Sequence, residues 1–378
     1  MNGSGHPLVV AVCGDPGGAN AVAPVIEALR AEGRVAVNAL AYRQASITLW
    51  TKRNLVFDDL GEGTTRTPAI QRLRNSGTGL LLTATSFNPI EPEKEFIAAA
   101  RSLGLPSLAV LDFWTNYTRR FSDADGRLVY VPDRIAIMDE RARDEMVAEG
   151  FDTTRLVITG QPAFDELAGW RSQFTPARRQ AIRDALSVGP SQWLILFASQ
   201  PLSLLYGTDP VDPLYPGYDE RMVLRALVVA LDQIAEQSHQ EIVLVIRPHP
   251  REQIQSFDKV QGRLIRIVVS KDGESRDLVM AADLVTGMTT ILLVDACYLG
   301  CVTVSLQPGL RFPDPLPTNP LGFSRGVYRE EEIKPVIERM LLDKEIRSSA
   351  QARLSKFHMD NGATQRVVKL VYQMIGLE

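Results

Sequence analysis

The sequence predicts an α/β protein built from two parallel, doubly wound sheets. Short apolar runs alternate with helical segments twice, first over residues 8–159 and again over residues 193–306. A polar helical stretch, 168–186, separates the two alternations. Strands that alternate with helices form βαβ units. We therefore expect two Rossmann-like domains, residues 1–168 and 187–358, that face a central cleft.

The composition narrows the class of protein. The 378 residues suffice for about two domains. A net charge of −4, without a long basic run, argues against a nucleic-acid partner. The three cysteines form no disulfide framework, which favours a reducing compartment, and Cys297 and Cys301 are expected in the core rather than on a metal. With no evident signal peptide and no apolar run of ~20 residues, we expect a cytoplasmic protein with at most peripheral membrane contact.

The loop after the first strand is the first candidate site. The apolar run 8–12 predicts a buried strand, and the loop leads into a helix that Asn20 is expected to cap. The loop lacks the GxGxxG pattern, so it does not imply a dinucleotide. Asp15 is expected to be an exposed carboxylate that contacts a ligand. Alternatively, the loop is a tight turn that merely needs its glycines, Gly17 and Gly18.

A second carboxylate follows a later strand of the first half. Further strands are expected at 35–41, 79–84, 107–111, 134–138 and 156–159, and helices at 96–103 and 140–150. The strand 107–111 delivers Asp112 at its carboxyl end. Asp112 therefore either contacts a ligand there or caps a helix.

The second half repeats the pattern of the first. Its strands are expected at 193–198 and 242–246, in a segment that ends at 286–287, and at 302–306. Long loops are expected at 206–218 and 308–320, and amphipathic helices at 221–237, 330–342, 343–357 and 363–375.

Polar side chains follow the strands of this second half. Arg247 and His249 come just after strand 242–246, and Thr289 and Thr290 begin a later helix. Ligands of open parallel sheets bind at the carboxyl ends of strands, and a helix start binds anions, so these residues predict a phosphate site. The set expected to bind a nucleotide's phosphates and ribose is Ser199, Gln200, Arg247, His249, Thr289, Thr290 and Asp295. The structural alternatives are a turn at His249, an ion pair at Arg247 and helix caps at the two threonines.

These groups suit transfer of an activated sugar. An acceptor hydroxyl that attacks an anomeric carbon needs a base, for which Asp15 is the first candidate and Asp112 the second. The departing nucleoside diphosphate needs charge stabilisation, which Arg247, His249 and the helix start can supply without a metal. The predicted catalytic residues are therefore Asp15, Asp112 and His249, with no metal and with the nucleotide-sugar as substrate rather than cofactor.

Four segments resemble the GT-B superfamily of nucleotide-sugar enzymes, above all the non-hydrolysing UDP-N-acetylglucosamine 2-epimerases. The segments are NAVAPVIEALRAEG, LGLPSLAVLDFW, TGQPAFDEL and ADLVTGMTTILLVDACYLG. The resemblance implies a GT-B fold whose last helix, 360–378, returns to the first domain. It places Asp112 at the position of a catalytic acid and Asp295 at that of a ribose-binding glutamate. By analogy of loop placement, Gly17, Gly18 and Asn20 would line the acceptor side.

The sequence departs from the epimerase pattern at three places. Residues 83–88, TATSFN, contain no acid where the epimerases have an aspartate. ASQPLS, residues 198–203, replaces a histidine–arginine loop, and Met288-Thr289-Thr290 replaces serine-glycine-glycine. The replacements resemble transferases: Ser199-Gln200 is similar to the phosphate loop of the lipid II transferase, and the GDPGGAN loop is placed as in that enzyme and in lipid A disaccharide synthase. Residues 247–250, RPHP, resemble the His-Pro motif of CDP-glycerol glycerophosphotransferases and some bacterial sialyltransferases.

The resulting hypothesis is an inverting, metal-independent glycosyltransferase of surface-polysaccharide biosynthesis. Its partners would be a nucleotide-sugar donor and a glycan, glycolipid or small-molecule acceptor, and a homodimer is compatible with the sequence. The first alternative is a UDP-GlcNAc 2-epimerase-like epimerase or hydrolase of a UDP-sugar. The second is a CDP-glycerol or CMP-sugar transferase, and the third is a non-catalytic nucleotide-sugar binding protein.

Overall fold

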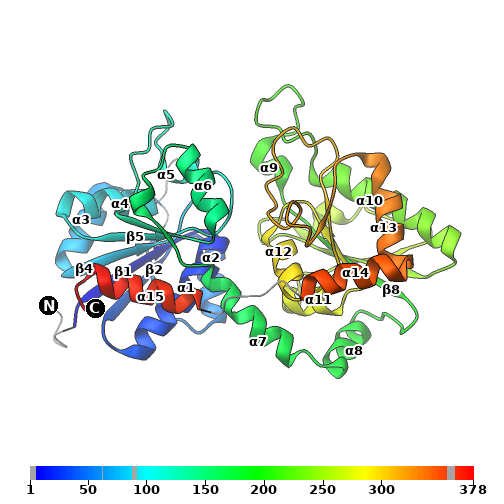
Figure 1. Ribbon diagram of the computed structural model, residues 1–378, viewed down its shortest axis with the longest axis horizontal. Coiled ribbons are helices and arrows are strands. Elements are labelled where there is room, and N and C mark those ends of the chain that lie inside the picture. Colours follow the sequence, from blue (N-terminus) through cyan, green and yellow to red (C-terminus); the bar gives the residue numbers. More distant parts are fainter. Residues whose placement is uncertain (1–5, 62, 87–91, 356–361) are drawn as a thin grey trace. The chain divides into compact units, whose positions relative to one another are not determined.

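The computed structural model describes residues 6–61, 63–86, 92–355 and 362–378, and it divides into two compact units (Figure 1). Unit 1 comprises Met1–Glu166 with Asp360–Glu378, and unit 2 comprises Leu167–Met359. Each unit is a wholly parallel sheet with helices on both faces, which confirms the predicted fold class. The expected boundary at 358–360 and residues 87–88 of the acid-free segment lie outside the described residues.

Unit 1 contains a seven-stranded sheet that reverses its order between β1 and β4. The strands, in the order in which they lie, are β3 (Asp58–Asp59), β2 (Ala36–Ala41), β1 (Leu8–Cys13), β4 (Thr78–Thr83), β5 (Ser107–Val110), β6 (Arg134–Ile137) and β7 (Leu156–Ile158). Its helices are α1 (Pro16–Glu32), α2 (Gln44–Lys52), α3 (Arg66–Asn75), α4 (Pro92–Leu103), α5 (Tyr117–Phe121), α6 (Glu140–Ala148) and α15 (Ala363–Met374). Such a reversal is where open α/β sheets bind ligands.

Strand β1 explains why the apolar runs of this half are continuous. Its residues Val9 and Ala11 pack with α1 and α15 on one face, whereas Val10 and Val12 pack with α3 and α4 on the other. A strand covered on both faces carries apolar side chains at every position, because neither face meets water. The central strands therefore lack the alternation of apolar and polar residues that marks a strand with one face in water.

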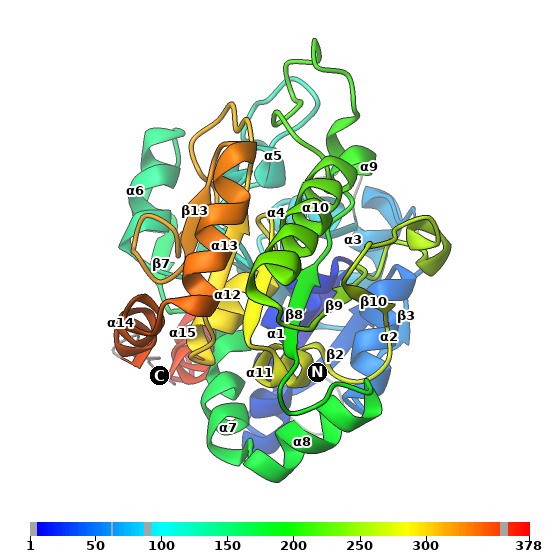
Figure 2. The same cartoon turned by 90° about the vertical axis from the view of Figure 1, so that its right-hand side faces the viewer.

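Unit 2 contains a six-stranded sheet that reverses between β8 and β11. Its strands, in spatial order, are β10 (Arg266–Val269), β9 (Ile242–Arg247), β8 (Trp193–Ala198), β11 (Leu284–Gly287), β12 (Thr303–Leu306) and β13 (Arg325–Val327). Its helices are α8 (Pro176–Ala185), α9 (Leu202–Tyr206), α10 (Glu220–Ser238), α11 (Ser275–Ala281), α12 (Ile291–Tyr298), α13 (Ile333–Leu342) and α14 (Lys344–Ser355), after the connecting helix α7 (Asp165–Gln173). Helices α10 and α13 pack side by side over one face, where they bury Ile195 and Phe197 of β8 (Figure 2).

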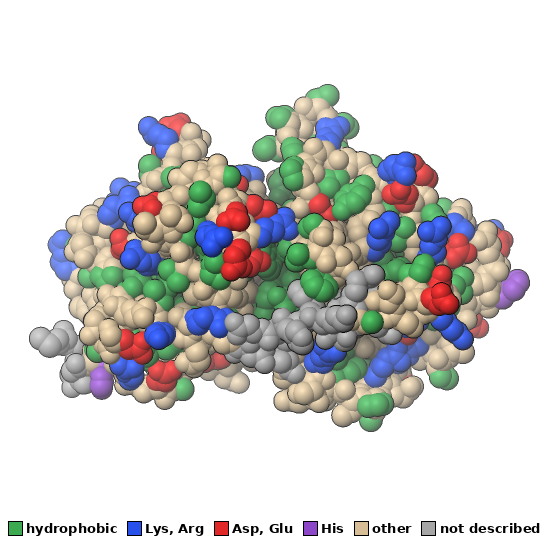
Figure 3. Space-filling model, viewed as in Figure 1, with side chains coloured by type: hydrophobic (Ala, Val, Ile, Leu, Met, Phe, Trp, Pro, Cys, Tyr) green, Lys and Arg blue, Asp and Glu red, His purple; other side chains and the backbone are tan. Residues whose placement is uncertain are grey.

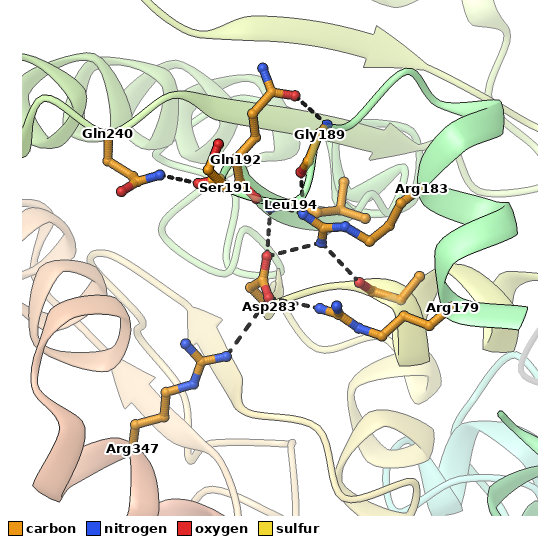
Figure 4. Close-up of polar contacts among 10 residues, drawn as sticks. Arg179, Arg183, Gly189, Ser191, Gln192, Leu194, Gln240, Asp283 and Arg347 are labelled. Carbon is orange, nitrogen blue, oxygen red and sulfur yellow. Dashed lines mark hydrogen bonds and ion pairs between the residues drawn. The ribbon is translucent and has the colours of Figure 1, made fainter. Parts of the chain in front are cut away.

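A partly buried ion cluster ties α8 to the edge of this sheet at which β8 and β11 begin. Asp283 accepts hydrogen bonds from Arg179 at 2.8 Å, from Arg183 at 3.1 Å and from the backbone N–H of Leu194 at 2.9 Å (Figure 4). The Arg183 guanidinium also donates to the carbonyls of Gly189 and Gln192. Because Arg183 is almost wholly buried, its charge depends on these partners.

The start of α1 differs from the sequence prediction. Asn20 does not cap this helix, which begins at Pro16 after Asp15. Proline fits the first helical position, since its missing N–H would have no partner there and its φ is already helical. The glycine-rich loop therefore forms the first turn of α1 rather than a separate turn.

On the face shown in Figure 3, basic and acidic side chains are interspersed over both units. None of the helices within the described residues combines the length and the apolar character that crossing a membrane requires.

Candidate functional site

Unit 1 gathers both predicted carboxylates at one edge of its sheet. Asp15 follows β1, Thr85 and Ser86 follow β4, and Asp112 follows β5. These three strands are neighbours and parallel, so their carboxyl ends lie together. We call the group formed by Asp15, Thr85, Ser86, Asp112, Arg43 and Arg120 the carboxylate site.

Asp15 is buried, contrary to the expectation of an exposed carboxylate. Only 7% of the residue is exposed, because the ends of the neighbouring strands surround it. One carboxylate oxygen lies 3.0 Å from Nη1 of Arg43, and the other accepts a hydrogen bond from Ser86 Oγ at 2.9 Å. The carboxylate is thus ion-paired and held in one orientation.

Asp112 is arranged in the same way on the other side of Thr85 and Ser86, the two residues that follow β4. Its Oδ1 lies 2.5 Å from Nη1 of Arg120 and 3.1 Å from Oγ1 of Thr85. Arg120 also donates to Thr85 Oγ1 at 2.8 Å and is 5% exposed. Asp112 does not cap a helix, since α5 begins at Tyr117 after Asn116. The helix-cap alternative for Asp112 is therefore wrong, and its contact with a ligand stays a prediction.

The glycines of the loop are required by close approach. A Cβ on Gly17 would lie 2.1 Å from Oδ2 of Asp112, and a Cβ on Gly18 would lie 2.4 Å from Cβ of Ala84. Real Cβ atoms do not approach other atoms this closely, so α1 reaches the carboxylate only because these positions lack side chains. Asn20 is half-buried further along the first turns of α1.

A buried pair that the sequence did not reveal supports this loop. Glu93, only 1% exposed, accepts hydrogen bonds from the backbone N–H of Gly14 and from the hydroxyl of Tyr42. The Tyr42 ring occupies the space in which a Gly14 side chain would lie. Glu93 comes in the first turn of α4, a position that acidic residues favour for the helix dipole alone, so its sequence context gave no signal.

Unit 2 brings most of the predicted phosphate ligands together at the carboxyl ends of β9, β8 and β11. Ser199 donates to Glu252 at 2.8 Å, and the other oxygen of Glu252 accepts from the backbone N–H of His249 at 2.7 Å. Gln200 accepts from the backbone N–H of Thr289 at 2.7 Å. We call the group formed by Ser199, Gln200, His249, Glu252, Thr289 and Thr290 the strand-end site.

The hydrogen bonds of His249 fix the position of its proton. Its Nδ1 accepts the backbone N–H of Arg251 at 3.1 Å. A neutral imidazole that accepts at Nδ1 carries its hydrogen at Nε2, so that atom is a donor. Glu252 was missed by the sequence interpretation, although it lies three residues after His249. Burial raises the pKa of its carboxyl, against the lowering effect of the hydrogen bonds from His249 and Ser199.

Thr290 caps α12, because its Oγ1 accepts the backbone N–H of Leu292 at 3.4 Å. The helix-cap alternative therefore holds for Thr290, and capping leaves its position at the helix start unchanged. The backbone N–H and the hydroxyl of Thr289 both donate to the side-chain oxygen of Gln200, at 2.7 Å and 3.3 Å.

The structure gives Arg247 a different role from the predicted phosphate contact. Its guanidinium donates to the carbonyls of Ser270, Asp272 and Gly273 and to the hydroxyl of Ser275. These bonds hold the loop between β10 and α11. The sequence placed this side chain correctly at the carboxyl end of a buried strand, where it is the last residue of β9, but the pattern carried no information about the carbonyls that face it.

Asp295 lies on α12 and is 7% exposed. Its Oδ2 lies 3.3 Å from Nε of Arg276, the second residue of α11. Arg276 was not predicted from the sequence, because helix α11 is short and its apolar pattern is weak.

Cys297 is buried, and burial raises the pKa of its thiol to about 12. Within the part of the chain that the structure describes, no cluster of three or more His, Cys, Asp or Glu residues is placed to hold a metal ion.

Two sequence comparisons found no relative: no family model matches the chain, and no curated protein sequence is similar to it. Solved structures are similar over nearly the whole chain. The UDP-GlcNAc 2-epimerase from Neisseria meningitidis, bound to UDP-GlcNAc, has a TM-score of 0.71 at 12% identity and covers 97% of this chain and 100% of its own. S. aureus MnaA, solved with UDP, has a TM-score of 0.72 at 13% identity and covers 98% of each chain.

A glycosyltransferase from Rickettsia africae has a TM-score of 0.67 at 10% identity, covering 99% of this chain and 100% of its own. At these identities the likeness establishes the fold. The chain has the two-domain GT-B fold of these structures, which confirms the fold that the resemblance in the sequence implied.

Proposed function

We propose that this protein is an enzyme that breaks the bond between the anomeric carbon and the phosphate oxygen of a UDP-activated sugar. Epimerisation or hydrolysis is the first candidate outcome, and glycosyl transfer is the second. The observation that carries the proposal is the carboxylate site, in which Asp15 and Asp112 flank the Thr85–Ser86 dipeptide and each forms an ion pair with an arginine.

The strand-end site supports recognition of the nucleotide. Nε2 of His249 is a hydrogen-bond donor, and the hydroxyls of Thr289 and Thr290 lie at the start of α12. Donors of this kind stabilise the charge that develops on a departing diphosphate. Glu252 fixes both Ser199 and the backbone of His249, so the donors are pre-arranged. In this proposal, Asp295 accepts hydrogen bonds from the ribose hydroxyls.

The number of carboxylates favours epimerisation over transfer. Inversion at C2 of the sugar removes a proton from one face and returns a proton to the other, which calls for two proton-transfer groups. Glycosyl transfer needs only one base, to take the acceptor's proton. Several of the similar structures are 2-epimerases, two of which were solved with UDP-GlcNAc, and S. aureus MnaA was solved with UDP. The protein is therefore proposed to use Asp15 and Asp112 as its two proton-transfer groups.

Glycosyl transfer remains a candidate because of the residues that follow β4. Thr85 and Ser86 present hydroxyls where the epimerase pattern has an acid. A chain that lacks this acid but keeps one base meets the needs of a transferase.

The product of a single incubation separates these outcomes. The protein is mixed with UDP-GlcNAc in D₂O without an acceptor, and the products are followed by proton NMR. A 2-epimer that carries deuterium at C2 establishes epimerisation, because the C2–H bond must break. Free sugar with UDP and an unlabelled C2 establishes hydrolysis. UDP release that appears only when an acceptor is added establishes transfer. No turnover of UDP-GlcNAc or UDP-glucose under any condition, with no binding of UDP, contradicts the proposal.

Asp15→Asn tests the role of the carboxylate with little change in shape. The amide still accepts from Ser86, but it cannot take a proton, so we expect kcat to fall by about 10²–10⁴-fold with an unchanged fold. Asp123→Asn is the matched control, because Asp123 pairs with Arg127 on the surface of the same unit. If Asp15→Asn turned over substrate as fast as the control, Asp15 would not be a proton-transfer group.

A further inference from the structure

Arg43 combines a positive φ with an extended ψ, which is rare for a residue other than glycine. Its φ is 73° and its ψ is 135°. Asn116 and His239 also have positive φ, but their ψ values of 33° and 26° place them in the left-handed helical region. That region is open to other residues at modest cost, whereas the region of Arg43 is nearly restricted to glycine. Arg43 therefore holds a strained backbone directly after β2.

Hydrogen bonds on both sides keep this backbone in place. The N–H of Tyr42 donates to the carbonyl of Cys13, which continues the pairing of β2 with β1. The carbonyl of Arg43 accepts from Oγ of Ser46 at 3.0 Å and from the N–H of Ile47 at 3.2 Å, at the start of α2. The turn between β2 and α2 is thus fixed by its neighbours. A glycine at position 43 would adopt it without steric cost.

The side chain gives the strained residue a role. Nη1 of Arg43 lies 3.0 Å from Oδ1 of Asp15, while Ser86 holds Oδ2. The Arg43 side chain is 29% exposed and that of Asp15 is 10% exposed, so the ion pair is partly shielded from water. Backbone strain of this kind persists only where the surrounding structure holds it in place, and it gathers at functional sites.

We propose that Arg43 is a positioning residue for Asp15, and that its strained backbone is tolerated because only this conformation sets the guanidinium against that carboxylate. The inference rests on the proposed function in one respect, that Asp15 is a proton-transfer group. Whether Arg43 holds the Asp15 carboxylate in place can be tested without a substrate.

The test compares Arg43→Gly with His239→Gly. Both changes relieve a positive φ, and His239 is an exposed residue at the end of α10 in the other unit. We expect His239→Gly to raise the apparent melting temperature by about 2–4 °C, whereas Arg43→Gly also leaves the Asp15 carboxylate without its counter-ion, so no comparable rise is expected in that variant. Arg43→Gly is expected to lower kcat by about 10²-fold with little change in KM, whereas His239→Gly leaves kcat unchanged. Added guanidinium ion, at a concentration far below that which denatures the wild type, is expected to restore part of the lost kcat in Arg43→Gly only.

A crystal structure of Arg43→Gly tests the inference without any measurement of enzyme activity. We expect the Asp15 carboxylate to turn away from Ser86 in the variant. A lower kcat in Arg43→Gly that added guanidinium ion does not restore would show a merely structural role and overturn the inference. So would an unchanged Asp15 in the crystal, or full activity in Arg43→Gly. If the wild type turns over no UDP-sugar, the proposed function fails, while the crystal structure still decides this inference.

Discussion

Glu252 is the residue whose surroundings differ most from what its place in the sequence suggested. It lies in a loop after a buried strand, yet its carboxylate joins Ser199 to the backbone of His249. Burial raises its pKa, so the folded protein binds this proton more tightly than the unfolded chain does. The stability from this group is present at pH values below the ordinary pKa of a glutamate, and it is lost as the pH rises through the raised pKa.

The Glu252→Gln variant removes this pH dependence. Relative to the variant, we expect the wild type to be most stable near pH 4 and to lose that advantage as the pH rises toward 7. Urea denaturation of both proteins at a series of pH values measures the difference. A difference that stays constant, or that grows with pH, would contradict the raised pKa.

Gly17 offers a second test at the residue scale. Its missing side chain lets α1 approach Asp112 Oδ2, and a Cβ would lie 2.1 Å from that oxygen. We expect Gly17→Ala to displace the carboxylate and lower kcat by about 10²-fold. Gly169→Ala is the control, because a Cβ at this position in α7 meets nothing within 4 Å and alanine favours a helix. Equal kcat values in the two variants would show that Asp112 takes no part in the reaction.

At the scale of elements, the central strands, the edge strand β7 and the long helices could be predicted from the sequence, but three of the four edge strands could not. The runs that became β1, β8 and β9 are buried on both faces and are therefore continuously apolar. Strands β3, β10 and β13 were missed. They are short strands near or at the sheet edges, and each carries exposed charged residues that weaken the apolar pattern.

Helix α8 provides a prediction about an element held by one buried charge. Asp283 neutralises Arg183, whose side chain is 3% exposed. Asp283→Asn keeps the shape but leaves the guanidinium without its counter-ion, so we expect a loss of about 3 kcal/mol in the free energy of unfolding. Glu236→Gln is the control, because its pair with Arg263 is exposed and its loss is expected to cost less than about 1 kcal/mol. Chemical denaturation measures both. Similar losses in the two variants would show that the cluster does not anchor α8.

At the scale of the whole molecule, the residues that follow strands were found from the sequence, whereas their partners were not. Asp15, Asp112, His249 and the two threonines lie at strand ends or helix starts, which the sequence pattern locates. Arg43, Arg120, Glu93 and Arg276 reach the sites from other elements, and only the tertiary structure brings them there. Arg247 shows the converse, since its position was predicted and its partners, the carbonyls of loop 270–273, were not.

The central claim is that the strand-end site of unit 2 binds the diphosphate of UDP. Titration calorimetry with UDP tests it most directly, with wild type, His249→Ala and, as a matched histidine control on the surface, His239→Ala. We expect the wild type and His239→Ala to bind UDP equally, and His249→Ala to bind about tenfold more weakly, the equivalent of one lost hydrogen bond. Failure of the wild type to bind UDP, or equal binding by all three proteins, would contradict the claim.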